Sequence, residues 1–199
     1  MVKKLSVGVF GAQGAISEHV TMMKNAIKEN NFSGTVIVIK NKKELNGIDA
    51  LIIPGGESTT ISKILYNSGL YEAISKRIKE SYLPIMGTCA GCVILASKMT
   101  DNFKDVKLLS AINMQVKRNA FGRQKESFEK NIKIKGFSKP FNAVFIRAPV
   151  IEKVWGNCEI LAKFDKKIIM AREDPFLALS FHPELTDDLR IHKYFLDMI

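Results

Sequence analysis

The stretch Pro84-Ile85-Met86-Gly87-Thr88-Cys89-Ala90-Gly91 indicates the fold, because a short apolar run turns directly into a helical one. The apolar run predicts a buried strand, and residues 90–98 predict a helix. A cysteine flanked by glycines at such a turn is the nucleophile-elbow arrangement, with cysteine in place of serine. A side chain at Gly87 or Gly91 is expected to clash in so sharp a turn, and Cys89 is expected to project from the edge of the sheet.

Strand-like and helical segments alternate on the amino-terminal side of this turn. Strands are predicted over residues 5–10, 35–39 and 50–53, and helices over 16–27, 59–66 and 71–80. This alternation predicts a parallel sheet with helices on both faces. The carboxy-terminal half instead holds closely spaced strand-like runs at 128–135, 143–147, 159–164, 168–172 and 177–181. We therefore expect one three-layer α/β domain over residues 1–199, flavodoxin-like and mostly parallel, with antiparallel additions in the second half.

A last helix is predicted near the end of the chain. Thr186 is expected to cap it, with two aspartates in its first turn, where carboxylates favour the helix dipole. Its expected apolar face is Leu189, His192, Phe195, Leu196 and Ile199.

Composition excludes several classes of protein. The chain has 199 residues, of which 46% are hydrophobic and 25% charged, as in globular proteins and unlike disordered chains, collagen or coiled coils. The net charge is +10, but lysine outnumbers arginine 24 to 6 and is spread along the chain, which disfavours nucleic-acid binding. No apolar run approaches the ~20 residues of a membrane span, and residues 5–10 are too short for a signal-peptide core. We expect a soluble cytoplasmic protein with no membrane partner.

The motif Phe181-His182-Pro183-Glu184 directly follows an apolar run. A cysteine nucleophile needs a histidine to exchange the proton and a third group to orient that histidine. In an extended segment His182 and Glu184 would point the same way, so the carboxylate could hold the imidazole. His19 and His192 lie on predicted helices with no acidic partner at useful spacing, so they are interpreted as ordinary helix-face residues.

Two further motifs leave alternatives open. One is a loop directly after a predicted strand, Pro54-Gly55-Gly56-Glu57-Ser58-Thr59-Thr60. This loop could offer a second oxyanion donor, or it could be a phosphate loop or a plain turn. The absence of Gly-Lys-Ser/Thr excludes a Walker loop. Cys89 and Cys92 form a C-x-x-C that could signal redox chemistry or a metal pair, although Cys92 is expected to face the core. With Cys158 they make three cysteines, which fits a reducing compartment better than a disulfide framework. No metal or cofactor is expected.

Together, these motifs resemble those of class I, triad-type glutamine amidotransferases, and within that class the family of glutaminase subunits of pyridoxal 5′-phosphate synthase. The markers that narrow the resemblance to this family are Gly11-Ala12-Gln13-Gly14-Ala15, Arg118-Asn119-Ala120-Phe121-Gly122-Arg123-Gln124 and Val144-Phe145-Ile146-Arg147-Ala148-Pro149. The resemblance covers nearly the whole chain. Ala120 and Cys92 depart from the family pattern at side chains with no assigned role.

The resemblance implies a site. Cys89 would be the nucleophile, His182 the acid/base and Glu184 the carboxylate that orients it. The amides of Gly56 and Ala90 would form the oxyanion hole. The positions that match the family's glutamine-binding residues are Gly56, Glu57, Ser58, Arg118, Ile146 and Arg147.

The resemblance also implies partners. Ammonia released from L-glutamine would pass to a (β/α)₈ synthase subunit in an assembly of 12 glutaminases and 12 synthases, and the glutaminase would be nearly idle until that partner sets the Gly55-Gly56 loop. The alternatives are a glutaminase subunit of another amidotransferase pathway, or a cysteine-elbow stress or redox protein of similar fold.

Overall fold

The structure is a computed structural model that describes residues 4–80, 82–100, 105–121 and 127–199. Its strands are β1 (Leu5–Phe10), β2 (Gly34–Ile39), β3 (Ala50–Ile53), β4 (Ile85–Thr88), β5 (Ala96–Met99), β6 (Ile112–Lys117), β7 (Ser127–Ile132), β8 (Phe141–Ile146), β9 (Val150–Val154), β10 (Glu159–Phe164), β11 (Lys167–Glu173) and β12 (Phe176–Leu179). Its helices are α1 (Ile16–Glu29), α2 (Lys42–Leu45), α3 (Ser58–Asn67), α4 (Leu70–Glu80), α5 (Ala90–Leu95) and α6 (Arg190–Leu196), with a 3₁₀ turn, η1, at Pro183–Leu185.

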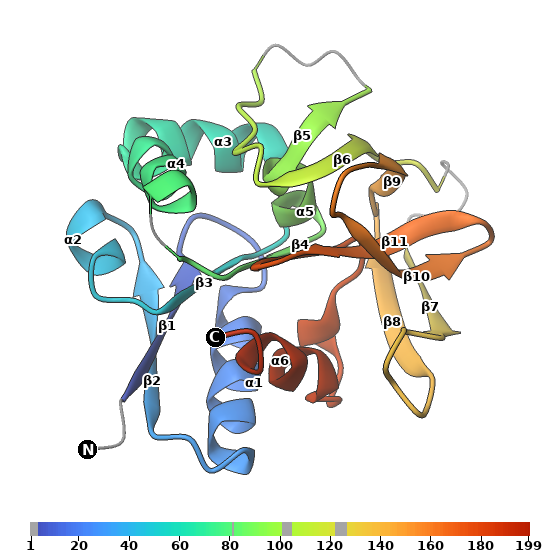
Figure 1. The fold of residues 1–199 in the computed structure, drawn as a ribbon, viewed down its shortest axis with the longest axis horizontal. Coiled ribbons are helices and arrows are strands. Elements are labelled where there is room, and N and C mark those ends of the chain that lie inside the picture. The colour runs from blue at the N-terminus through green and yellow to red at the C-terminus, as the bar shows by residue number, and fades with distance from the viewer. Residues whose placement is uncertain (1–3, 81, 101–104, 122–126) are drawn as a thin grey trace.

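A ten-stranded sheet runs through the middle of the protein (Figure 1). Its order is β2-β1-β3-β4-β12-β11-β9-β6-β5, with β10 paired to β11. The first five strands in this order are parallel, and β12, β11, β9 and β6 then pair antiparallel in succession. The strands β7 and β8 form a separate antiparallel pair. The predicted mostly parallel α/β sheet with antiparallel additions in the second half is confirmed.

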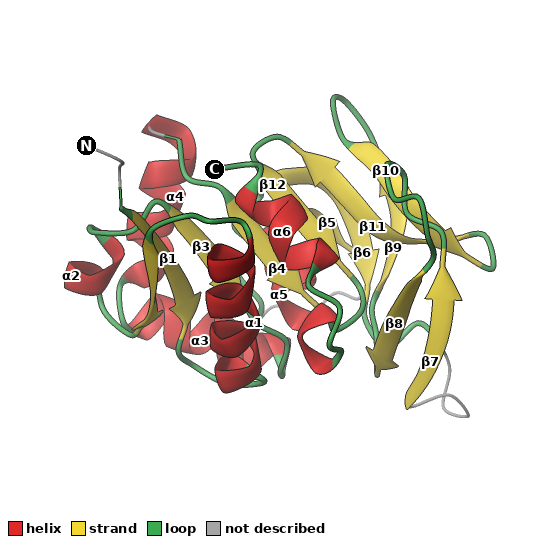
Figure 2. Ribbon diagram, turned by 90° about the horizontal axis from the view of Figure 1, so that it is seen from below, coloured by secondary structure: helices red, strands yellow, loops and turns green. Residues whose placement is uncertain are grey.

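The helices lie in two layers, one on each face of the sheet. In Figure 2 the helices α1 and α6 lie in front of the sheet, and α3, α4 and α5 lie behind it. Alternate residues of one strand enter opposite cores: Leu51 and Ile53 pack with α3 and α4, whereas Ala50 and Ile52 pack with α1 and α6. Parallel strands buried on both faces in this way read as continuous apolar runs, as β3 does.

One predicted helix is wrong at its end. Residues 90–98 were expected to be helical, but α5 ends at Leu95 and the chain continues as β5, which pairs with β6. The strand has no β-branched residue, so its conformation follows from this tertiary pairing, which the hydroxyl of Ser97 strengthens by donating to the carbonyl of Ile112 at 2.7 Å. The strands β6 and β9 were also missed.

The last helix begins later than predicted. Thr186 does not cap it, because its hydroxyl donates to the carbonyl of Pro183 at 3.0 Å and belongs to the turn after η1. Helix α6 begins at Arg190, whose amide donates to the Asp188 carboxylate at 3.0 Å. Within the ranges described, no helix combines the length and apolar character that a membrane span requires.

Candidate active site

Cys89 occupies the turn between β4 and α5 in a backbone conformation that is rare for a residue with a side chain, φ 50° and ψ −106°. Its amide donates to the carbonyl of Leu179 in β12 at 2.8 Å. A Cβ at position 87 would lie 2.5 Å from the carbonyl oxygen of Gly91, and one at position 91 would lie 2.0 Å from that of Ile53. The predicted need for glycine on both flanks of the cysteine is confirmed.

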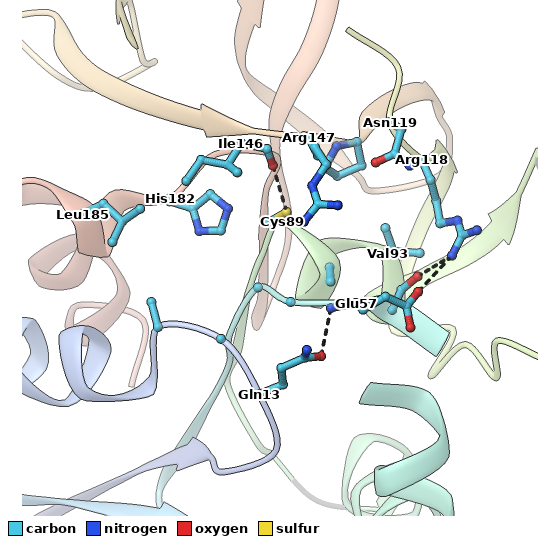
Figure 3. Close-up of a pocket in the computed structure, with 17 residues that line it drawn as sticks. Gln13, Glu57, Cys89, Val93, Arg118, Asn119, Ile146, Arg147, His182 and Leu185 are labelled. Atoms are coloured by element: carbon cyan, nitrogen blue, oxygen red, sulfur yellow. Dashed lines mark hydrogen bonds and ion pairs between the residues drawn. The ribbon is translucent and has the colours of Figure 1, made fainter. Parts of the chain in front are cut away.

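The thiol of Cys89 is nearly buried, with 7% of the residue exposed, and the residue lines a cavity. It donates to the carbonyl of Ile146 at 3.7 Å (Figure 3), and His182 lies close to it, because one Cβ added at position 55 would contact both residues. The cysteine therefore sits where a molecule in the cavity can touch it.

His182 and Glu184 follow β12 and lie in contact. The Nδ1–H of His182 donates to Oε1 of Glu184 at 2.8 Å. The segment is not extended as expected, because Pro183–Leu185 forms the turn η1, yet the carboxylate still reaches the ring. Burial alone would lower the pKa of His182, but hydrogen bonds to Cys89 and Glu184 raise it to about 10. An imidazolium beside a thiol is the arrangement in which a cysteine nucleophile is activated.

The backbone of the loop after β3 packs closely against Cys89 and His182. A Cβ at position 55 would lie 2.5 Å from Cε1 of His182 and 3.1 Å from Cβ of Cys89. Gly56 has φ +145°, which side chains rarely tolerate. The loop is held from the β1–α1 connection, where Gln13 Oε1 accepts from the Glu57 amide at 3.1 Å (Figure 3) and the carbonyl of Gly55 lies against Gly14.

Glu57, Ser58 and Arg118 form a charged cluster on the cavity wall. Burial alone would raise the pKa of Glu57, but hydrogen bonds from Thr59 and Thr60 at the start of α3 lower it to about 2, so it stays ionised. The Arg118 guanidinium donates to the Ser58 hydroxyl at 2.8 Å and lies 3.5 Å from the Glu57 carboxylate (Figure 3). The cavity thus offers both a fixed negative and a fixed positive charge.

The cavity has a volume of about 510 Å³, within the usual range for small-ligand sites. The predicted site residues that line it are Gly56, Glu57, Ser58, Cys89, Ala90, Arg118, Ile146, Arg147 and His182, whereas Glu184 lies buried behind His182. Gly55, expected from sequence as part of the oxyanion loop, also lines the cavity. The lining residues given no role from sequence are Gln13, Gly14, Ala15, Val93, Asn119, Pro149 and Leu185. For Gln13 and Asn119 the family markers were the available signal. Of those markers, Gly122, Arg123 and Gln124 lie outside the described residues.

The two remaining histidines lie on the buried faces of α1 and α6, as expected for His192, but the prediction that His19 has no acidic partner is wrong. His19 and His192 are both 0% exposed, and Nδ1 of His19 lies 3.3 Å from Nε2 of His192. Nε2 of His19 lies 3.2 Å from Oε2 of Glu184. His19 therefore has an acidic partner far away in the chain, which local spacing could not reveal.

Cys92 and Cys158 are buried and not disulfide-bonded. Burial and the neighbouring Cys89 and Cys158 raise the pKa of the Cys92 thiol above its usual range, and burial with Glu173 raises that of Cys158 to about 12. Such thiols are poor nucleophiles at neutral pH. Within the described part of the chain, no group of three or more His, Cys, Asp or Glu side chains could hold a metal ion.

The architecture matches solved glutamine amidotransferases. A crystal structure described as a glutamine amidotransferase aligns with a TM-score of 0.85 and 41% identity, covering 96% of this chain and 97% of that one. A second, described as a glutamine amidotransferase from Thermotoga maritima, aligns with a TM-score of 0.63 over 98% of this chain and 84% of that one. At 16% identity it shows a shared fold alone. The class that this fold defines is the glutamine amidotransferases.

The particular family follows from the sequence. The model of the SNO glutamine amidotransferase family matches residues 9–199. A protein of Pyrococcus horikoshii named pyridoxal 5′-phosphate synthase subunit PdxT is 44% identical, covering 96% of this chain and 98% of the relative. One of the same name from Brevibacillus brevis is 45% identical over 98% and 97%. The chain belongs to the SNO glutamine amidotransferase family, and the predicted resemblance is confirmed.

Proposed function

We propose that this protein is the glutaminase subunit of a pyridoxal 5′-phosphate synthase, with residues 1–199 forming a single glutamine amidotransferase domain. It hydrolyses L-glutamine to L-glutamate and ammonia. The observation that carries the proposal is that Cys89 and His182 line a cavity of small-ligand size, with His182 hydrogen-bonded to Glu184. The name shared by full-length relatives supports the pathway.

The triad would work through a thioester. Beside the protonated His182, the Cys89 thiol gives its proton to solvent, and the resulting thiolate attacks the side-chain amide carbon of glutamine, forming a C–S bond. His182, already protonated, gives its proton to the leaving nitrogen as the C–N bond breaks and ammonia departs. His182 then takes a proton from water, which attacks the thioester carbon and releases glutamate and the free thiol. Glu184 keeps the imidazole oriented and stabilises its positive charge throughout.

Substrate binding would use the charges of the cavity. A guanidinium forks onto a carboxylate, so Arg118 and Arg147 are the candidates for the α-carboxylate of glutamine. The α-ammonium needs a carboxylate or a carbonyl, and Glu57 stays ionised over the whole physiological pH range. The further glutamine-binding residues in this proposal are Gly56, Ser58 and Ile146.

The oxyanion of the tetrahedral intermediate would be stabilised by two backbone amides, those of Gly56 and Ala90. Each such donor contributes about 3–4 kcal/mol to the transition state. The Gly55-Gly56 loop lies against Cys89 and His182, which supports this assignment. No metal or cofactor is needed for these steps.

The ammonia would serve a synthase subunit with a (β/α)₈ fold, in an assembly of 12 copies of each chain located in the cytoplasm. Partner binding would set the oxyanion loop and switch hydrolysis on. The competing function is a glutaminase subunit of another amidotransferase pathway, which would use the same triad with a different synthase.

The test is glutamate release by the wild type and by Cys89→Ala, with and without a pyridoxal 5′-phosphate synthase subunit. We expect stimulation of the wild type by the synthase and no hydrolysis by the variant, while ammonium salts still support pyridoxal phosphate formation by the variant complex. Cys92→Ser is the matched control and should retain most activity. A Cys89→Ala complex that made pyridoxal phosphate from glutamine at the normal rate would refute the nucleophile assignment. Stimulation by a different synthase alone would support the competing pathway.

A further inference from the structure

Behind the proposed triad lies a pair of buried histidines that the mechanism above does not use. His19 lies in the first half of α1 and His192 lies in α6, and both helices cover the same face of the sheet (Figure 2). Their rings are 5.5 Å apart between centroids. Burying an imidazole is costly unless its ring nitrogens have hydrogen-bond partners, so the polar groups around these two rings need to be identified.

The polar partner that accounts for the burial of His19 is Oε2 of Glu184, the carboxylate oxygen that does not contact His182. Its Oε1 accepts from His182, but Oε2 is buried and has no well-formed hydrogen bond among the described residues. The nearest polar group is Nε2 of His19, 3.2 Å away. The same nitrogen lies 3.1 Å from the hydroxyl of Thr88, the residue that precedes the nucleophile. His19 thus touches both the third member of the triad and the strand end that carries the first.

The protonation of the two rings decides what His19 presents to the carboxylate. Burial, with the imidazoles of His192 and His182 nearby, holds the pKa of His19 well below its usual value, and burial lowers that of His192 to about 4. Both rings are therefore neutral. If Nε2 of His19 lacked a proton, its lone pair would face the Glu184 carboxylate. The favourable tautomer carries the proton on Nε2 of His19, leaving its Nδ1 to accept from Nε2–H of His192.

A neutral donor suits this position. The groups that contact Glu184 are His182 from the loop after β12 and His19 from α1, and the Thr88 hydroxyl of β4 lies against His19. A cation at position 19 would compete with His182 for the carboxylate, whereas a neutral N–H supports the carboxylate and leaves its charge for the imidazolium. An apolar side chain would leave half of a buried carboxylate without a partner, which is costly.

We propose that His19 is a positioning residue for the triad: its Nε2–H holds the second oxygen of Glu184, and through Glu184 it fixes the orientation of His182. The inference rests on the proposed function of Cys89, His182 and Glu184. His19 does not touch substrate, so its replacement should change kcat and the reactivity of the Cys89 thiol toward alkylation and leave KM for glutamine unchanged.

The test compares three substitutions at one position. His19→Gln places an amide N–H near the position of Nε2, His19→Asn places it near Nδ1, out of reach of Glu184, and His19→Leu removes it. Met23→Ala, on the same helix and equally buried but in apolar surroundings, is the control for lost packing. Each protein is checked for folding by circular dichroism and thermal unfolding.

Two readouts are used for each variant. The first is steady-state glutamate release in the complex with the synthase. The second is the rate at which iodoacetamide alkylates Cys89 in the isolated chain from pH 5 to 9, followed by mass spectrometry of the Cys89 peptide. The other two thiols are buried with raised pKa and serve as internal references.

We expect His19→Asn and His19→Leu to lower kcat by about ten- to a hundredfold with KM unchanged, as for a lost hydrogen bond to a buried charge. Alkylation of Cys89 near pH 6.5 should slow about tenfold, and its pH profile should move to higher pH. His19→Gln should stay within about threefold of the wild type in both readouts, and so should Met23→Ala in spite of its lower stability.

Equal losses in His19→Gln and His19→Asn, or losses matched by Met23→Ala, would overturn the positioning role and leave a structural one. An alkylation rate of Cys89 in His19→Leu equal to that of the wild type would also overturn the positioning role. Should the wild type release no glutamate with any synthase while the alkylation pattern holds, the glutaminase proposal fails and the positioning role of His19 stands.

Discussion

Replacing Gly55 with alanine tests how tightly the loop after β3 is fitted to Cys89 and His182. The added Cβ would lie 2.5 Å from Cε1 of His182, 3.3 Å from its Nδ1 and 3.1 Å from Cβ of Cys89. Carbon atoms in contact prefer about 3.5–4.0 Å. The imidazole or the loop must therefore move by about 1 Å. The ring is not free to do so, because its Nδ1 is held by the 2.8 Å hydrogen bond to Glu184.

A displacement of about 1 Å in a reacting group can lower the rate about 10²-fold. We expect Gly55→Ala to lower kcat for glutamine hydrolysis in the synthase complex by about that factor. We expect stability to fall by about 1–3 kcal/mol, the usual cost of overpacking. The effect on rate should exceed the effect on stability, because the protein can absorb the methyl group only by moving the catalytic pair.

The assay is steady-state glutamate release by each variant in the presence of saturating synthase, together with urea unfolding of the isolated chain. Gly47→Ala is the matched control, since a Cβ there would meet nothing within 4 Å. It should leave kcat unchanged. If Gly55→Ala retained kcat within about threefold of the wild type, the loop could not be packed against the pair in the active state, and the reasoning above would be refuted.

Other predictions concern the triad, the oxyanion loop and pH. Glu184→Gln should slow turnover less than His182→Ala does, because the third member of a triad aligns the base without exchanging the proton; equal and total loss in two folded variants would contradict this. Gly56→Ala, at φ +145°, should depress the synthase-stimulated rate of glutamate release much more than the basal rate, and a wild-type chain equally active alone would rule out gating. His192 is neutral in the folded protein, because burial lowers its pKa to about 4, but it becomes charged on unfolding below its usual pKa of 6.5. The free energy of unfolding should therefore decline by roughly 2–3 kcal/mol as pH falls from about 6.5 to about 4. Urea unfolding should show a flatter dependence of this free energy on pH for His192→Leu than for the wild type.

Much of the fold could be predicted because its signals are local. The strands 50–53 and 159–164 were predicted to the residue, since apolar, β-rich runs bounded by turn residues need no partner to be recognised. The strand β5 was missed because Ala96–Met99 carries no strand pattern and is extended only by pairing with β6. Thr186 looked like a helix cap because its neighbours are aspartates, but its hydroxyl closes a different turn.

The sequence by itself determined the cysteine elbow, its two glycines, the His-Pro-Glu motif and the family, because each is encoded by residues that are neighbours in the chain. Only the tertiary structure brought together His19, Thr88, Glu184 and His192. Helical periodicity predicts which face of α1 or α6 is buried, but it does not predict which residues of distant elements that face contacts in the core. That meeting depends on how both helices pack on one face of the sheet, so the polar contacts behind the triad became visible only in three dimensions.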